Sequence, residues 1–346
     1  MLRRGTTVLS FPSDLIGATG RRYVFSQLIQ ERPHVGRVWL ATSERHSDVV
    51  ENADLQNSRS GSDKFILKDV PNEIFAGFKE NILPRFRGKS GHSRLPLDTI
   101  SDQRVLVYRY LTDDFSNLVN KGISMRARKQ ILKASLLGIA ELHDYDIVHL
   151  DIKPDNIMVD CHGDPPTITV EQVQIADLEN AAYLPKGRCI KGMLAGNDNW
   201  RSPEAHLKGE LNKPADIFSF GVVCIFAMLG RVILGPDDDF RKHMAQGALP
   251  AMVRLQRQVS YFGDQEGLNG LIKHVGDEEV SCQILKMLWE DRKADYIPYD
   301  PFSDWTEVEH DAPFRDLIRK LTDLDPSRRI PARQALEHTW FEGVDY

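Results

Sequence analysis

The chain of 346 residues carries 44 Lys and Arg against 50 Asp and Glu, a formal charge of −6 with neutral His. This mild acidity argues against a protein that coats nucleic acid, and we expect no nucleic-acid partner. With 41% hydrophobic and 27% charged residues, the composition is that of a globular protein. The length favours about two domains or lobes.

The sequence predicts an intracellular protein that is not bound to a membrane. None of the four cysteines forms a C-x-x-C pair, which is typical of a reducing compartment and provides no zinc knuckle. The longest apolar run, Phe218 to Leu229, is shorter than the roughly 20 residues that cross a bilayer. Near the N-terminus, Asp14 appears before a signal-peptide core of adequate length. We expect a cytoplasmic or nuclear location.

After an N-terminal extension, residues 1–22, the stretch 23–112 has the pattern of a small β-rich lobe. Short apolar runs alternate there with polar breaks, as in strands joined by turns. The runs cover residues 35–41, 65–70 and 104–111. Between the second and third runs, residues 72–83 place apolar side chains at helical spacing and predict one amphipathic helix that ends at Pro84. The basic segment 84–94 is interpreted as a loop.

Residues 113–346 predict a larger, mainly helical lobe. Ser124 is a candidate N-cap for a helix that runs to His143 with one wide apolar face. Pro214 introduces a second helix, Ile217 to Leu229, whose apolar side chains point all round and predict burial. The stretch 236–313 is charged and poorly periodic, so we expect it to be irregular, and its role cannot be read from the sequence.

The stretch Ile147-Val-His-Leu-Asp-Ile-Lys-Pro-Asp-Asn-Ile-Met-Val159 places Asp151, Lys153 and Asn156 in one short loop. Transfer of a phosphoryl group from ATP needs a carboxylate near the attacking hydroxyl, a cation near the phosphate, and an oxygen ligand for Mg²⁺. All three types are present in this loop. A further carboxylate, Asp177, follows the apolar pair Ile175-Ala176, and we expect it at a strand end, where it could bind the metal.

At these residues the chain resembles the eukaryotic-type protein kinases, whose serine/threonine branch reads H-R-D-x-K-x-x-N where this sequence has H-L-D-I-K-P-D-N. Ser202-Pro-Glu204 resembles the A-P-E element, residues 216–221 resemble the buried F helix, and Leu324 to Ile330 completes the family order. The resemblance implies an α+β fold with an N-lobe over residues 23–112 and a C-lobe over 113–346. It also implies an ion pair between Glu204 and Arg329, and a role for Asp216 in holding the catalytic loop.

The resemblance further implies an ATP and Mg²⁺ site. Asp151 would orient or deprotonate the acceptor hydroxyl, Lys153 would neutralise phosphate charge, and Asn156 and Asp177 would hold the metal. In the small lobe, Phe65-Ile-Leu-Lys68 is similar to the strand whose lysine reaches the phosphates, with Glu80 preferred over Glu73 as its partner. The remaining nucleotide contacts would come from the glycine-rich loop and from the hinge beyond Tyr108: Gly36, Val38, Arg109 and Leu111.

The glycine-rich loop and the magnesium motif depart from the family pattern. Glu31 and Pro33 stand where the first two loop glycines are expected, and Glu179 replaces the glycine of D-F-G. Glycines let backbone amides approach phosphates, so these changes weaken the expected nucleotide grip.

Two further departures concern the segment after Asp177. Leu150 replaces the arginine that receives an activation-loop phosphate, and residues 178–201 contain no Ser or Thr. We therefore expect any activity not to depend on phosphorylation of that segment. The G-T pair of the family is Gly196-Asn197, whose Asn could still bond Asp151 and Lys153.

Three functions fit these patterns. The first is an ATP- and Mg²⁺-dependent serine/threonine kinase acting on a protein substrate. The second is a pseudokinase, a nucleotide-binding or scaffold protein with little turnover, as indicated by Glu31, Pro33 and Glu179. The third is a small-molecule kinase of the aminoglycoside or choline type, which gives no reason for Lys153 or for Ser202-Pro-Glu204. The sequence leaves the oligomeric state open.

Overall fold

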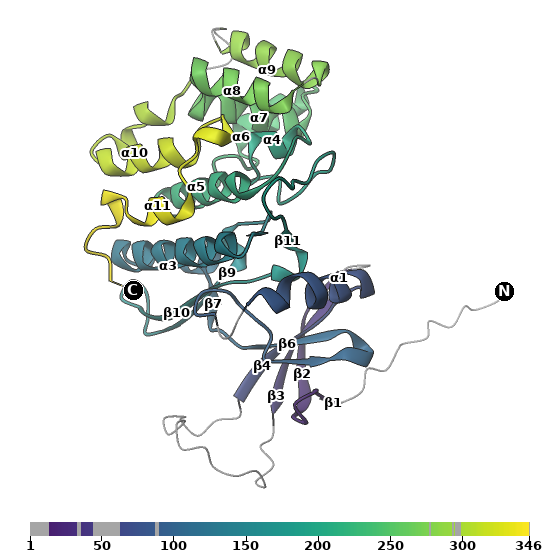
Figure 1. The fold of residues 1–346 in the computed structure, drawn as a ribbon. Helices are drawn as coiled ribbons and strands as arrows, with labels where there is room; N and C mark the ends of the chain where they lie inside the picture. Colours follow the sequence, from purple (N-terminus) through teal and green to yellow (C-terminus); the bar gives the residue numbers. More distant parts are fainter. Residues whose placement is uncertain are drawn as a thin grey trace, which may run out of the picture. The chain divides into compact units, whose positions relative to one another are not determined.

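The structure is a computed structural model that describes residues 14–32, 36–43, 63–86, 90–276, 278–292, 294 and 299–345. The chain divides into two units (Figure 1). The smaller unit takes in the described parts of Met1–Lys79 and Leu95–Tyr110, and the larger one those of Glu80–Arg94 and Leu111–Tyr346. The first is rich in strands and the second in helices, which confirms the predicted α+β class.

The smaller unit is built on a six-stranded antiparallel sheet in the order β1-β2-β3-β4-β6-β5 (Figure 1). Its strands are β1 (Asp14–Ile16), β2 (Arg22–Arg32), β3 (Gly36–Ser43), β4 (Asp63–Asp69), β5 (Asp98–Ile100) and β6 (Val105–Arg109). The three apolar runs read from the sequence are β3, β4 and β6. Residues 14–22, assigned above to an extension, form the edge strand of this sheet and the start of β2.

One face of this sheet carries the core of the smaller unit. The ring of Tyr23 on β2 meets that of Phe65 on β4 edge-on, with centroids 5.2 Å apart. The Tyr23 hydroxyl donates to the buried carboxylate of Asp98 at 3.0 Å, and this hydrogen bond and burial both raise the pKa of Tyr23. The polar tip of a buried aromatic residue is therefore satisfied within the sheet.

The amphipathic helix predicted over residues 72–83 is present but is not a continuous α-helix. It is α-helical in α1 (Asn72–Gly77), a π-helix over Phe78–Ile82 and a 3-10 turn over Leu83–Arg85. Phe75, Phe78 and Ile82 are buried as the pattern predicted. Because Pro84 has no N–H to donate to the carbonyl four residues earlier, the α-helical hydrogen bonding cannot continue through it.

The larger unit is organised around two long helices, α3 and α5 (Figure 1). Ser124 caps α3 by accepting from the Ala127 N–H at 3.3 Å, and Asn212 caps α5 by accepting from the Lys213 N–H at 2.7 Å. The main helices and short helical turns are α2 (Phe115–Asn120), α3 (Met125–Asp144), α4 (Pro203–His206), α5 (Lys213–Leu229), α10 (Ala312–Leu321) and α11 (Ala332–Leu336). Both predicted long helices are confirmed, and α5 is almost wholly buried.

Short strands carry the loops at one end of these helices. A three-stranded sheet has the order β10-β9-β7, and a second pair joins β11 to β8. The strands are β7 (Asp113–Asp114), β8 (Ile147–Val148), β9 (Ile157–His162), β10 (Thr169–Ile175) and β11 (Ala182–Tyr183). The loop expected to carry chemistry lies between β8 and β9, and Asp177 follows the end of β10.

The prediction that residues 236–313 are irregular is wrong. The described residues of this segment include the helices α6 (Asp238–Ala245), α7 (Pro250–Phe262), α8 (Gln265–Val275) and α9 (Glu279–Asp291). The helices are short and each starts anew, with Asp237 and Asp264 as side-chain caps of α6 and α8, so the apolar period is repeatedly reset. Leu255, Val259 and Leu271 belong to a hydrophobic core that α7, α8 and α9 share.

An ion pair between Glu204 and Arg329 is fully buried in the larger unit. Arg329 donates two hydrogen bonds to the Glu204 carboxylate, at 2.6 and 2.8 Å, and further ones to the carbonyls of Asp323, Leu324 and Pro214. Burial raises the pKa of Glu204, but the Arg329 guanidinium lowers it by more, so the net direction is downward. This pair, implied by the resemblance, connects α4 to the segment before α11.

Among the described residues, no helix combines the length and apolarity that crossing a bilayer requires.

We predict that Arg329→Met destabilises the larger unit by about 3–5 kcal/mol, because it leaves the Glu204 carboxylate buried without its cation. The urea midpoint followed by circular dichroism measures the effect. The double variant Glu204→Leu, Arg329→Met should recover most of the loss, because no charge stays buried. A single variant that unfolds at the wild-type midpoint would contradict the prediction.

Candidate active site

A single buried carboxylate holds the loop between β8 and β9. Asp216 on α5 has no solvent exposure and accepts hydrogen bonds from the backbone N–H groups of His149 at 2.8 Å and Leu150 at 2.7 Å. His143 on α3 approaches the same carboxylate with Nε2 at 3.0 Å. The role of Asp216 that the resemblance implied is thus seen in the geometry, and His143 is a partner that sequence reasoning missed.

The backbone of this loop is strained at the residue that Asp216 holds. Leu150 has φ of 64°, in the left-handed region that bulky residues rarely adopt. Such a conformation persists only where the surrounding contacts overdetermine it. The two hydrogen bonds that the His149 and Leu150 N–H groups donate to Asp216 provide that constraint immediately before Asp151, so the buried helix α5 fixes where the Asp151 side chain starts.

The three chemical groups expected in the loop meet one another. Lys153 Nζ lies 2.6 Å from Asp151 Oδ2, and both side chains are partly exposed. Asn156 is buried and donates from Nδ2 to the Asp151 carbonyl at 2.9 Å and to Asp151 Oδ2 at 3.2 Å. The loop therefore presents a carboxylate oriented by a cation and an amide.

Asp177 is tied to the same loop through the residue before it. The Ala176 N–H donates to the Asn156 carbonyl at 2.8 Å, and His149 Nε2 lies 2.7 Å from the Ala176 carbonyl. Because His149 Nδ1 accepts from the Asp151 N–H, the ring proton is assigned to Nε2, which donates to Ala176. His149 is buried and holds the loop through both of its ring nitrogens. Asp177 itself has φ of 66°, a second left-handed residue in the site.

The donor set of the loop fits a magnesium ion. The Asn156 amide uses its NH₂ group on Asp151, which leaves its oxygen as a hard ligand, and Asp177 adds a carboxylate one residue beyond Ala176. The structure shows no cluster of three or more His, Cys, Asp or Glu side chains within the described residues that would hold a metal alone. Mg²⁺ commonly takes one or two protein oxygens and completes its shell with water and substrate phosphates, so the two groups suffice.

In the smaller unit, the candidate nucleotide residues lie on adjacent strands. Lys68 on β4 pairs directly with Val38 on β3, so both occupy the same level of the sheet. Gly36 begins β3 with φ of +129°, and a Cβ there would collide with the Asp69 carbonyl oxygen. The Asp69 carboxylate also accepts from the Arg37 N–H, which ties the start of β3 to the end of β4.

The structure shows how far the other predicted nucleotide residues are buried. Arg109 is exposed at the end of β6, and Leu111 is buried at the start of the larger unit's second segment. Glu80 is exposed in the π-helical turn, and its pairing with Lys68 stays a prediction. Glu31 is exposed on β2 and forms an ion pair with Arg37 at 2.7 Å, while Pro33 lies outside the described residues.

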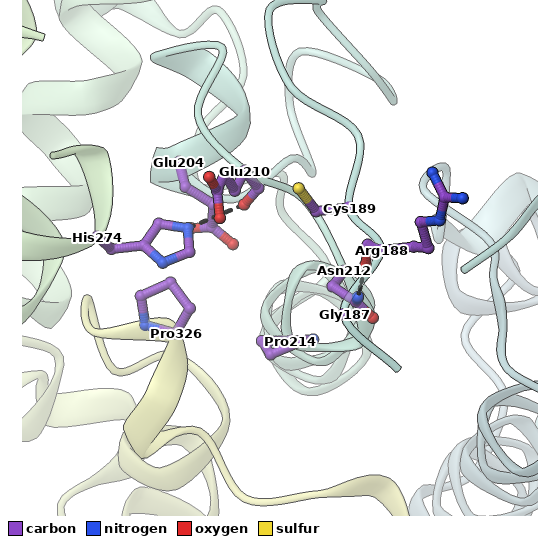
Figure 2. Close-up of a pocket in the computed structure, with 9 residues that line it drawn as sticks. All are labelled: Gly187, Arg188, Cys189, Glu204, Glu210, Asn212, Pro214, His274 and Pro326. Atoms are coloured by element: carbon purple, nitrogen blue, oxygen red, sulfur yellow. Dashed lines mark hydrogen bonds between the residues drawn. The ribbon is translucent and has the colours of Figure 1, made fainter. Parts of the chain in front are cut away.

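The segment after Asp177 is held in place by several contacts within the larger unit. Leu150 packs with Ile190 and Ala195 against Ala205, Leu211 and Ala215. Ile190 and Leu211 form a two-way backbone bridge, and Asn212 donates to the Arg188 carbonyl at 2.6 Å. Figure 2 shows this last bond beside a cavity of about 250 Å³ that Cys189, Glu204 and His274 also line. The apolar Leu150 thus anchors the segment where the family has an arginine.

Within the described residues, Asn197 forms no hydrogen bond with Asp151 or Lys153, contrary to expectation. Its side chain accepts from the Asn199 N–H at 3.0 Å. The preceding Gly196 has φ of +75°, and a Cβ there would collide with the Leu150 carbonyl oxygen, so the segment passes close to the catalytic loop. Sequence reasoning also missed Arg201 and Arg254, two buried guanidinium groups beside this segment, because no short motif connects α7 to the catalytic loop.

Comparison with known proteins identifies what this architecture is similar to. The model of the protein kinase domain matches residues 96–341. Dual specificity protein kinase CLK1 of Homo sapiens is 25% identical over 225 residues, which cover 58% of this chain and 41% of that protein. Serine/threonine-protein kinase AFC1 of Arabidopsis thaliana is 24% identical over 246 residues, covering 62% and 48% respectively. The chain thus spans less than half the length of these curated relatives.

We predict that Asp216→Asn loosens the catalytic loop. The NH₂ group that replaces one carboxylate oxygen cannot accept a hydrogen bond, so one of the two backbone N–H groups loses its acceptor. Hydrogen exchange of peptides covering residues 147–153 should speed up by about tenfold or more, corresponding to the loss of about 1–3 kcal/mol. The matched control is Asp146→Asn, whose carboxylate pairs with Lys213 at the surface. Unchanged exchange in Asp216→Asn would contradict the assigned role.

Proposed function

This chain belongs to the protein kinase family, and we propose that it transfers the γ-phosphate of ATP to serine or threonine hydroxyls of a protein substrate. The observation that carries the proposal is the group of Asp151, Lys153 and Asn156, in which the lysine and the amide both donate to Oδ2 of the carboxylate. The side chains with a direct chemical role in this family are all present. The small-molecule kinase alternative loses its support, since the matching family is that of protein kinases.

Each residue would have a distinct part in the transfer. Asp151 accepts the hydroxyl proton or orients the hydroxyl, and it lies 2.6 Å from the ammonium group of Lys153, which neutralises charge on the phosphate. Asn156 and Asp177 would hold Mg²⁺, which offsets the negative charge of the phosphates. We propose that Lys68, Val38 and Arg109 of the smaller unit contact the nucleotide. Glu80, the proposed partner of Lys68, and Leu111, proposed near adenine, belong to the larger unit.

The proposed activity does not require phosphorylation of the segment 178–201. In the family, a phosphate on this segment pairs with an arginine before the catalytic aspartate. Here Leu150 packs against the apolar cluster of Ala205, Leu211 and Ala215, on which Ile190 and Ala195 of the segment also pack. The Arg85 guanidinium also stacks on the Tyr183 ring, 3.1 Å from its centroid. Burial of apolar surface thus replaces an ion pair that needs a modification.

A pseudokinase is the second candidate, and specific residues favour it. Glu179 replaces the glycine two residues after Asp177, and it is buried in the turn that follows this proposed metal ligand. Glu31 lies near the tip of the β2–β3 hairpin, although Arg37 partly neutralises it. A protein of this type would bind nucleotide weakly or without metal, and would act through its surface on a partner protein. A cytoplasmic or nuclear location is proposed in either case.

Asp151→Asn should lower phosphate transfer from [γ-³²P]ATP to a mixed protein substrate or to the chain itself by about 10²- to 10⁴-fold, because the base is removed. The control Asp155→Asn changes an exposed residue of the same loop and should retain activity. Equal incorporation by wild type and Asp151→Asn would remove the kinase proposal and favour the pseudokinase.

Magnesium should strengthen ATP binding through Asn156 and Asp177. We predict that the wild type gains several degrees of melting temperature with ATP and Mg²⁺ over ATP with EDTA, and that Asp177→Asn loses this increment. The matched control is Asp164→Asn, an exposed residue of the turn between β9 and β10. An increment that survives in Asp177→Asn would place the metal elsewhere.

A further inference from the structure

Two arginines next to the catalytic loop are buried with too little negative charge around them. Arg201, just before Ser202-Pro-Glu204, and Arg254 on α7 are each 8% exposed. Arg201 donates to the Gly196 carbonyl at 2.5 Å and to Asp198 at 2.7 Å, and its Nε has no partner within the described part of the chain. Burial lowers the pKa of both guanidinium groups, while the nearby Asp198 raises it.

Arg254 has no ion-pair partner among the residues that the structure describes. Its Nε and Nη2 both donate to one neutral acceptor, Asn199 Oδ1, at 3.1 and 3.0 Å, and the guanidinium also lies over the Phe240 ring. A guanidinium fork that meets a single amide oxygen retains donors for a carboxylate or phosphate. The negative charge of Asp198 raises the pKa of both arginines, and its side chain is 59% exposed.

The segment that carries Arg201 is also net positive, although Lys191 pairs with Glu210 at 3.8 Å. Residues 184–208 carry five Lys or Arg against two Asp or Glu, in a chain whose net charge is −6. Lys186, Arg188 and Lys191 are exposed on this segment. The nearby His206 has its pKa lowered to about 3, first by burial and then by Arg201, and its Nε2 has no hydrogen-bond partner in the described structure.

This cationic site lies beside the proposed acceptor position. The Arg201 guanidinium is bonded to the carbonyl of Gly196, and Gly196 packs on the carbonyl of Leu150, the neighbour of Asp151. The negative charge of Asp151 also raises the pKa of Arg201. A peptide whose hydroxyl reaches Asp151 would therefore bring a flanking residue within range of Arg201 and Arg254.

We propose that Arg201 and Arg254 form a specificity site that binds an anionic side chain, a carboxylate or a phosphate monoester, flanking the acceptor residue of the substrate. Asp198 is the internal carboxylate that occupies Arg201 until such a group replaces it. The proposal rests on the proposed function, because it needs a peptide with its hydroxyl at Asp151. It names the chemistry of the substrate, which the proposed function left open.

The test uses the full chain and peptides with one Ser in an Ala/Gly background, carrying Asp, phosphoserine, Ala or Arg at each of four flanking positions on either side. Phosphorylation is measured as kcat/KM, and binding by fluorescence anisotropy with Mg²⁺ and a non-hydrolysable ATP analogue. At one or more positions, anionic peptides should exceed the Ala peptides about tenfold in kcat/KM and in affinity, as expected for charge-assisted hydrogen bonds. The Asp and phosphoserine arms identify which anion is preferred.

Variants separate this site from general electrostatics. Arg254→Gln should reduce the ratio of anionic to Ala peptides to about twofold or less, whereas Arg241→Gln, an equal charge change on α6 that pairs with Asp238, should leave it unchanged. Asp198→Asn, at an exposed position that does not threaten folding, should raise the ratio, because it removes the competing carboxylate. A purely structural role for Asp198 predicts no such rise.

The outcomes distinguish the two proposals. If the wild type phosphorylates peptides without preferring anionic ones, the specificity site is overturned and the kinase proposal stands. If no peptide is phosphorylated, the kinase proposal fails, and the anisotropy arm still decides the site: equal affinity for Asp, phosphoserine and Ala peptides overturns it. A fall in the ratio for both Arg254→Gln and Arg241→Gln would also overturn it.

Discussion

The fully buried carboxylate of Asp216 fixes the catalytic loop to the almost wholly buried helix α5, and the arrangement of the candidate site depends on it. Its oxygens bind two consecutive backbone N–H groups, of His149 and Leu150, and so hold Leu150 in a left-handed conformation. A buried carboxylate is stable only when such donors compensate for its lost hydration. The N–H groups of the strained turn therefore stabilise the buried charge, and the carboxylate in turn holds the backbone of the turn. Asp151 is the next residue after Leu150.

From this turn, the constraint passes through hydrogen bonds to the second acidic group. His149 Nε2 donates to the Ala176 carbonyl, and the Ala176 N–H donates to the Asn156 carbonyl. The loop that positions Asp151 therefore also positions Asp177. Leu150 packs against the same apolar cluster as Ile190 and Ala195 of the following segment. One buried carboxylate thus orders the proposed base, the proposed metal ligands and the proposed substrate-binding segment.

Sequence patterns predicted much of the fold and of the site, for identifiable reasons. The helix capped by Ser124 and the apolar helix α5 have long, uninterrupted periods, and the residues around Asp151 are close in sequence, so local rules sufficed. The helices α6 to α9 were missed because their short periods reset at each cap. Arg254 and His143 were missed because their contacts join residues 55 and 73 positions apart, and such pairings arise only from tertiary packing.

The central claim is that Asn156 and Asp177 hold a divalent metal next to the Asp151 carboxylate. The most direct measurement is a crystal structure of the chain grown with Mn²⁺ and a non-hydrolysable ATP analogue, with the metal located by its anomalous scattering. The account predicts a Mn²⁺ ion at about 2.0–2.3 Å from the Asn156 amide oxygen and an Asp177 carboxylate oxygen, bridging to phosphate. A nucleotide bound without metal at these two residues, or a metal bound elsewhere, would contradict it.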